Sequence, residues 1–310
     1  MNYEETLIEL AKKDERIVVM TAENRALIRN MPPILGERFI DTGITEQTMI
    51  GAAAGLALRG RIPVVHALAS FLTMRAFEFI RTDVGIARLP VKLCGYIPGF
   101  LSDGNGPTHQ AIEDVSILRG IPGMEVFAPA DEDDLVTMLP DILNSSSPAY
   151  IRINHKKSEF RHAPYLPGKA EVISTGKDIT LLTYGLLFEN SFKAKSILEE
   201  RGYSVGLVNL RSLKPLDEEL VLTIANDTGL IVTIEDHFLT GGLYSILAEL
   251  FLKNKITCNV FPMALRERWF KPSLLNEVME FEEFTPSKIA EHAIREFENI
   301  LNIKIINYAE

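Results

Sequence analysis

The sequence has few cysteines, little tryptophan and no long hydrophobic segment. Its 310 residues include two cysteines, Cys94 and Cys258, and one tryptophan. Each cysteine stands alone in an apolar, strand-like run, which favours a buried thiol over a disulfide or a metal site. We expect both thiols to be buried in a reducing compartment, and we therefore predict a cytoplasmic protein.

Positive charge is also in short supply. Lysine and arginine number 32 against 42 aspartates and glutamates, which gives a net charge of −10. A basic face is normally needed to displace counterions from phosphates, so no nucleic-acid partner is expected. The longest apolar stretch, Met49 to Leu58, is far shorter than the roughly 20 residues of a membrane-spanning helix. The N-terminus, MNYEETLIEL, is acidic and amphipathic, unlike a secretory signal, so no membrane partner is expected either.

Short β-branched runs alternate with helix-length segments through the first half of the chain. This alternation predicts the α/β class, with a parallel sheet covered by helices on both faces. At 310 residues, two domains are expected. The expected strands are 17–20, 38–40, 63–67, 91–96, 125–128 and 149–153, and the expected helices lie near 3–12, 45–58, 70–87 and 131–143.

The alternation stops over 154–170, where NHKKSEFRHAPYLPGKA has no sustained period. It then resumes with strands at 179–184, 205–210 and 230–235 and helices at 187–200, 217–226, 241–253 and 285–299. We therefore predict two doubly wound domains, 1–155 and a smaller one at 173–310, joined by a linker at 156–172.

A carboxylate lies at the start of an unusual helix in DTGITEQTMIGAAAGLALRG (41–60). Gly43 turns the chain after a strand, Thr45 can cap the helix, and Glu46 falls in its first turn. The small residues that follow let a helix pack closely, as deep or interface helices do. A glutamate in a first turn often only complements the helix dipole, so this segment alone is a weak signal.

Two later segments carry an aromatic stripe and a loop histidine. The stripe recurs at helical spacing in 70–90 and by itself indicates a core face; it consists of Phe71, Met74 and Phe77. In 99–131, a glycine-rich loop presents His109 before a helix. An isolated loop histidine is more often merely solvated, although loops at strand ends of α/β sheets are where ligands usually bind.

Taken in order, GITEQ, the SFL helix, GPTHQ, LRGIPGM and FAPAD resemble the pyrimidine-binding domain of the transketolase and deoxyxylulose-phosphate synthase family. IEDHFLTGGLYS (234–245) is similar to a segment of the family's C-terminal domain, so the resemblance covers almost the whole chain. It does not cover the family's N-terminal half, whose Gly-Asp-Gly…Asn motif holds Mg²⁺ and the diphosphate of the coenzyme. No such motif occurs in this sequence.

The resemblance implies thiamine diphosphate as the coenzyme and assigns roles to the matched residues. Glu46 would hydrogen-bond N1′ of the aminopyrimidine and favour its imino tautomer. Burial would help by raising the pKa of that carboxyl, against the helix dipole. Phe71 would stack on the ring, with Met74 and Phe77 lining the same pocket, and His109 would act near the reacting oxygens of the substrate. No metal ligand is implied in this chain, because the partner would bind Mg²⁺.

The substrate-binding positions depart from the family pattern. Asn105 replaces an aspartate that binds a substrate hydroxyl. The family's phosphate ligands fall at Leu27, Ile97 and His155, and a further arginine has no counterpart before Met1. Either nearby cations replace these ligands, namely Arg152, Lys156 or Lys157, or these lysines only solvate the linker and the substrate terminus is not a sugar phosphate.

The resemblance implies the C-terminal subunit of a split transketolase, which would move a two-carbon ketol unit from a ketose to an aldehyde. It would need a partner with the diphosphate and metal site, by analogy in a two-plus-two heterotetramer. The alternatives are a deoxyxylulose-phosphate-type carboligase and a non-catalytic regulatory subunit. A nucleotide-binding Rossmann protein is disfavoured, because no G-x-G-x-x-G follows a predicted strand. Residues 235–237 (EDH) are either an interface cluster or a solvated turn.

Overall fold

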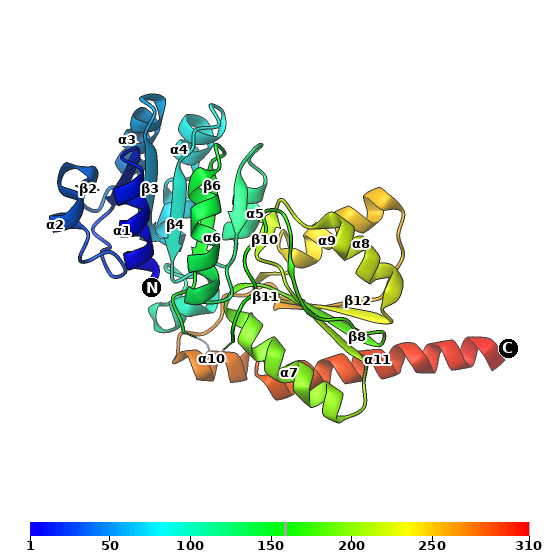
Figure 1. The fold of residues 1–310 in the computed structure, drawn as a ribbon. Coiled ribbons are helices and arrows are strands. Elements are labelled where there is room, and N and C mark those ends of the chain that lie inside the picture. The colour runs from blue at the N-terminus through cyan, green and yellow to red at the C-terminus, as the bar shows by residue number, and fades with distance from the viewer. Residues whose placement is uncertain (158–159, 310) are drawn as a thin grey trace.

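A computed structural model describes residues 1–157 and 160–309, which form two sheets with their covering helices (Figure 1). The first sheet has the strand order β10-β5-β6-β4-β3-β1-β2, in which β10 alone is antiparallel to its neighbour. Its strands from the first half of the chain are β1 (Ile17–Thr21), β2 (Phe39–Asp41), β3 (Ile62–Leu68), β4 (Lys92–Tyr96), β5 (Glu125–Phe127) and β6 (Ala149–Ile153).

Helices cover both faces of this sheet, because successive strand residues point to opposite sides. Val18 and Met20 of β1 belong to the apolar cluster that includes α3, whereas Val19 belongs to the cluster of α1 and α6. The predicted doubly wound α/β class is confirmed. The helices of this half are α1 (Tyr3–Lys13), α2 (Pro32–Leu35), α3 (Glu46–Leu58), α4 (Phe77–Phe79), α5 (Asp114–Arg119) and α6 (Glu132–Asn144).

The second sheet has the strand order β12-β11-β8-β9-β7, with β7 antiparallel at one edge. Helices α7 and α11 pack on one face, and α8 and α9 supply residues to the cluster on the other face. The strands are β7 (Glu171–Ser174), β8 (Ile179–Thr183), β9 (Val205–Asn209), β11 (Leu230–Phe238) and β12 (Val260–Leu265), and the helices are α7 (Phe188–Glu200), α8 (Glu218–Asp227), α9 (Leu243–Asn254), α10 (Leu275–Phe281) and α11 (Pro286–Ala309).

The two halves are more closely joined than a simple linker implies. Strand β10 (Ser212–Lys214) follows β9 of the second sheet, yet it pairs with β5 of the first. One apolar cluster also runs through both halves and includes Val126 of β5 and Val208 of β9. The predicted division into domains remains a proposal, and residues 158, 159 and 310 of the predicted segments lie outside the described residues.

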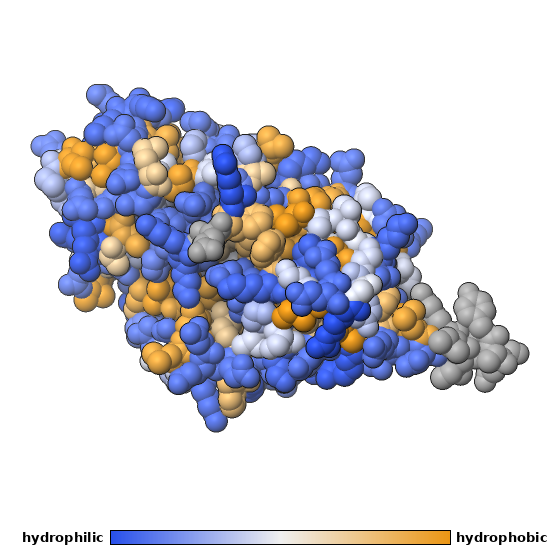
Figure 2. Space-filling model, turned by 60° about the horizontal axis from the view of Figure 1, so that its bottom comes forward, coloured by the Kyte–Doolittle hydropathy of each residue, from blue (hydrophilic) through white to orange (hydrophobic). Residues whose placement is uncertain are grey.

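The two cysteines differ in their surroundings. Cys94 is fully buried in β4, as expected, and burial raises the pKa of its thiol to about 12. Cys258 is half-buried and lies in the irregular segment before β12, so the expectation of a buried strand cysteine is wrong there. Among the described residues, no helix is long and apolar enough to span a bilayer. The face shown in Figure 2 is mainly hydrophilic, with apolar patches between the polar side chains.

Candidate active site

Glu46 is the first residue of α3, directly after the turn that follows β2. Thr45 precedes it, but the Thr45 hydroxyl donates to the carbonyl of Thr42 (2.8 Å), so the expected side-chain cap is not formed. The Glu46 side chain is 3% exposed. A carboxylate buried to this extent needs a hydrogen-bonding partner, and Arg75 Nη1 donates to its Oε2 at 3.0 Å.

Phe71 and Arg75 lie on η2 (Phe71–Arg75), a π-helical turn that follows β3. The regular helix expected over 70–87 is instead divided into two π-helical turns with α4 between them. Such turns are rare and frequently occur at functional sites. This turn places the Arg75 guanidinium over the Phe71 ring, 4.2 Å from its centroid, within the range of a cation–π contact.

His109 lies on the loop after η4 (Gly99–Asn105). Its backbone N–H donates to Gly106, which has a φ of 82° that favours glycine, and its Nδ1 lies 2.9 Å from the hydroxyl of Thr108. The imidazole and the Phe71 ring are 4.9 Å apart, tilted by 59°. The structure therefore brings Glu46, Phe71 and His109 into one cluster, joined through Arg75.

The remaining predicted coenzyme residues lie beside this cluster with less distinctive surroundings. Met74 is half-buried, and Phe77 packs against the apolar cluster that contains α3. Their assignment to a coenzyme pocket stays a prediction.

Residues from the second half of the chain contact the loop that carries His109. Gln110 is 1% exposed, and its Nε2 donates to the carbonyl of Phe270 at 2.9 Å. The Phe270 ring packs edge-on against Phe100 of η4, at 5.1 Å. Because Phe270 follows β12, the position of His109 depends on the C-terminal sheet as well as on its own.

Arg152 cannot serve as a replacement phosphate ligand, which corrects one alternative drawn from the sequence. It is 2% exposed and paired with Asp114 (2.9 Å) and Asp236 (2.7 Å). Burial lowers the pKa of this guanidinium, but the two carboxylates outweigh burial and raise it. The alternative of a solvated turn at 235–237 is also wrong, because these residues are buried in β11. They form an interface between the two sheets instead.

The other predicted substrate positions lie on segments that follow strands of the first sheet. Within the described ranges, none of them makes a hydrogen bond or a ring contact with Glu46, Phe71, Arg75 or His109. Leu27 packs against the apolar cluster of α1. Ile97 follows β4 with a φ of 46°, a strained conformation for a β-branched residue that often marks functional sites. Asn105 is exposed, and its Nδ2 donates to Ser102. His155 is exposed, as are Lys156 and Lys157 beside it, and this set keeps its proposed role only as a prediction.

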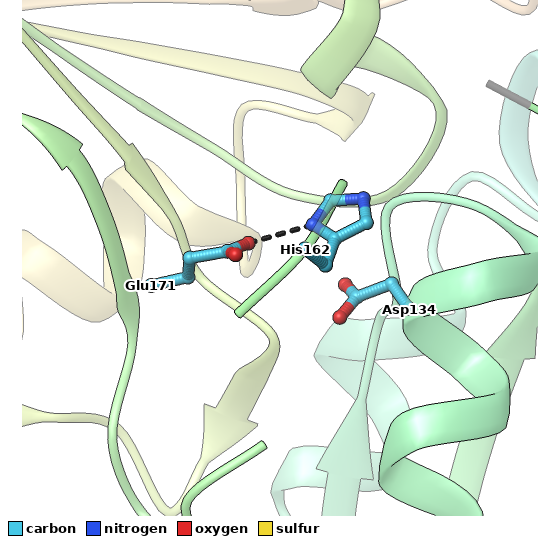
Figure 3. A group of neighbouring side chains, drawn as sticks. All are labelled: Asp134, His162 and Glu171. Atoms are coloured by element: carbon cyan, nitrogen blue, oxygen red, sulfur yellow. Dashed lines mark hydrogen bonds and ion pairs between the residues drawn. The ribbon is translucent and has the colours of Figure 1, made fainter. Parts of the chain in front are cut away.

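One cluster has the residue types of a metal site but is occupied by protein cations. Asp134, His162 and Glu171 offer ligand atoms within 4.8 Å of one another (Figure 3). Arg211 lies against two of them, 2.7 Å from Asp134 Oδ1 and 3.0 Å from Glu171 Oε1. His162 uses Nδ1 for Glu171 (2.7 Å) and Nε2 for Asp131 (2.8 Å). We therefore interpret the cluster as an ion network that joins α6, the linker and β7.

The family follows from the sequence comparisons. Residues 1–159 match the family "Transketolase, pyrimidine binding domain", and residues 168–286 match "Transketolase, C-terminal domain". The chain therefore belongs to the transketolase family, whose pyrimidine-binding domain is that of thiamine-diphosphate enzymes.

Within this family, the chain is similar in extent to separately encoded subunits. It is 37% identical to the 6-deoxy-6-sulfo-D-fructose transketolase subunit SqwH of Clostridium sp. (strain MSTE9), over 81% of this chain and 80% of that protein. A Methanocaldococcus jannaschii protein named "Putative transketolase C-terminal section" is 32% identical, over 95% of this chain and 94% of that protein. In contrast, the chain spans 43% of 1-deoxy-D-xylulose-5-phosphate synthase from Caldanaerobacter subterraneus, at 36% identity.

Solved structures of transketolases are also similar to this chain. A structure described as "Split gene transketolase, inactive beta4 tetramer" superimposes with a TM-score of 0.87 at 31% identity and covers 96% of this chain and 97% of its own. A Pichia stipitis transketolase has a TM-score of 0.74 at 19% identity and supports the fold alone.

Proposed function

We propose that this chain is the coenzyme-activating subunit of a split, thiamine-diphosphate-dependent transketolase. The observation that carries the proposal is the buried Glu46 carboxylate, which Arg75 links to Phe71 and, through it, to His109. These residues fit an aminopyrimidine, because a carboxyl group can share a proton with a ring nitrogen and a phenylalanine ring offers a flat apolar surface. Thiamine diphosphate, when bound, supplies the carbon nucleophile of the reaction.

The residues of this chain would then have separate tasks. Glu46 shares a proton at the ring nitrogen, which requires a carboxyl group shielded from water. Phe71 orients the ring and excludes water from it. His109 donates a hydrogen bond, or moves a proton, at the reacting oxygens of the substrate.

A partner subunit would supply the diphosphate and Mg²⁺ site, since the sequence has no Gly-Asp-Gly…Asn motif. Exposed apolar side chains on the segments that contain Glu46 and Phe71 support the proposal that a partner subunit covers these segments. Ile44 is 68% exposed, Leu58 71% and Ile86 73%. A helix such as α3, apolar on all sides, is normally buried. We propose a heterotetramer with two copies of each chain, this chain forming the homodimer within it.

Mixing tests the reaction. The chain is combined with a polypeptide that carries the missing motif, thiamine diphosphate and Mg²⁺, and ketol transfer from a ketose to an aldehyde is followed. We expect activity only when both proteins are present. Condensation of a 2-oxo acid with an aldehyde would instead favour the deoxyxylulose-phosphate-type reaction, and no turnover with any donor would favour a regulatory subunit.

A ketose with a sulfonate in place of its phosphate is a more specific candidate substrate. The relative from Clostridium is named for 6-deoxy-6-sulfo-D-fructose, and the family's phosphate positions here are Leu27, Ile97 and His155. A sulfonate has a single negative charge, whereas a phosphate monoester carries about −1.5 to −2 and needs more cationic ligands. We expect kcat/KM to be higher for the ketose sulfonate than for the phosphate or the plain ketose; a preference for the phosphate would overturn this candidate.

A further inference from the structure

Arg75 makes the two contacts that the proposed function assigns to the coenzyme ring. Its Nη1 donates to Glu46 Oε2 at 3.0 Å, and its guanidinium lies over the Phe71 ring at 4.2 Å. A guanidinium is flat, delocalised and rich in N–H donors. An aminopyrimidine is also flat, and its ring nitrogen can share a proton with a carboxyl group, so both groups suit one carboxylate and one aromatic face.

These two groups cannot occupy the same place. The Phe71 ring is also in contact with the His109 imidazole, at 4.9 Å between centroids. An aminopyrimidine that pairs with Glu46 and stacks on the same face of Phe71 therefore has to displace Arg75 from both contacts. Arg75 is the neighbour that can leave, because its side chain is 42% exposed and would be rehydrated as it moves, whereas Glu46 is buried beneath it.

We propose that Arg75 is a placeholder for the aminopyrimidine ring: it pairs with Glu46 and covers Phe71 until the coenzyme displaces it. The inference rests on the proposed function of Glu46 and Phe71. It makes Arg75 a positioning residue, which keeps the buried carboxylate paired and the aromatic face covered. Coenzyme affinity is then lowered by the contacts that Arg75 gives up.

The test compares Arg75→Met with wild type in the complete complex of this chain and its diphosphate-binding partner. Methionine keeps an unbranched apolar stem but loses the charge and the donors. Arg81→Met is the matched control, because Arg81 is an exposed arginine six residues further along the same segment. Thiamine diphosphate is titrated in the presence of Mg²⁺ by calorimetry, and its association rate is followed by fluorescence.

We expect Arg75→Met to bind the coenzyme roughly three- to tenfold more tightly and more quickly, since a half-exposed ion pair and a cation–π contact no longer have to be broken. Arg81→Met should match wild type. In a structure of the coenzyme complex, the Arg75 guanidinium should lie away from the Phe71 ring. Unchanged or weaker binding by Arg75→Met, or Arg75 still stacked on Phe71 beside the bound coenzyme, would overturn the proposal.

Two further variants separate this inference from the function on which it rests. Glu46→Gln and Phe71→Ala should both impair binding or activation of the coenzyme. If neither changes binding or activation, the proposed function itself fails. If both impair the coenzyme site while Arg75→Met weakens binding, the function stands and Arg75 is instead a permanent support for Glu46.

Discussion

The pH dependence of unfolding tests the ion network around His162. Burial lowers the pKa of His162, but hydrogen bonds with Asp131 and Glu171 outweigh burial and raise the pKa from 6.5 to about 9. The folded state therefore prefers the protonated ring. Its contribution to stability is complete below pH 6.5, falls as the pH rises and is lost above about pH 9. One pKa unit corresponds to about 1.4 kcal/mol, so this difference corresponds to about 3 kcal/mol.

The assay is urea unfolding of wild type and His162→Gln at several pH values. Glutamine keeps a hydrogen-bonding side chain without a titratable charge. We expect it to lower the free energy of unfolding by up to about 3 kcal/mol below pH 6.5 and by much less above pH 9. His155→Gln is the control, because His155 is an exposed histidine seven residues before His162. This substitution should leave the free energy of unfolding nearly unchanged at every pH.

The quantity to compare is the difference in the free energy of unfolding between wild type and His162→Gln at each pH. Burial raises the pKa of Glu235 from 4.5 to about 8, so this carboxyl also makes the fold less stable as the pH rises through that window. Its effect is common to wild type and variant and cancels in the difference. An equal loss of stability for His162→Gln at both ends of the pH range would refute the assignment of a protonated His162.

Three further predictions concern other parts of the molecule. Arg152→Met should lower the free energy of unfolding by about 3–5 kcal/mol in urea titrations, because Asp114 and Asp236 are left buried and unpaired; a loss below about 1 kcal/mol would contradict this. A thiol reagent should label Cys258 first and Cys94 only as the chain unfolds, and equal rates on mass spectrometry would be inconsistent with their burial. His109→Ala should lower turnover by about 10²–10⁴ with coenzyme binding nearly unchanged, and parallel loss of both would argue against its role.

Most of the regular elements could be predicted from sequence patterns, although these patterns do not predict β12 or α10. Alternating apolar runs indicate the buried parallel strands, and the small residues after Glu46 indicate a closely packed helix. The short strand β10 could not be predicted in this way, because three residues have no measurable period and its partner β5 lies far away in the sequence. Strand β7 is not predicted for a similar reason, as it has four residues and directly follows the aperiodic segment over 154–170.

Contacts between segments that are distant in the sequence could not be predicted either. Arg152 belongs to a strand that ends near the predicted substrate site, so the sequence suggested a phosphate ligand; its two buried aspartate partners come from α5 and β11. The sequence does not predict the contacts of Arg75, because a regular helix is expected over 70–87 and a π-helical turn places Arg75 against Glu46 and Phe71 instead.

The most direct test of the central claim is the rate at which the C2 proton of thiamine diphosphate exchanges with deuterium in the complete complex. Glu46→Ala should slow this exchange by about 10²–10⁴, the usual contribution of a positioned acid–base group. Glu78→Ala, which removes an exposed glutamate of α4, should leave the exchange rate unchanged. Exchange at the wild-type rate in Glu46→Ala, with the coenzyme still bound, would contradict the account.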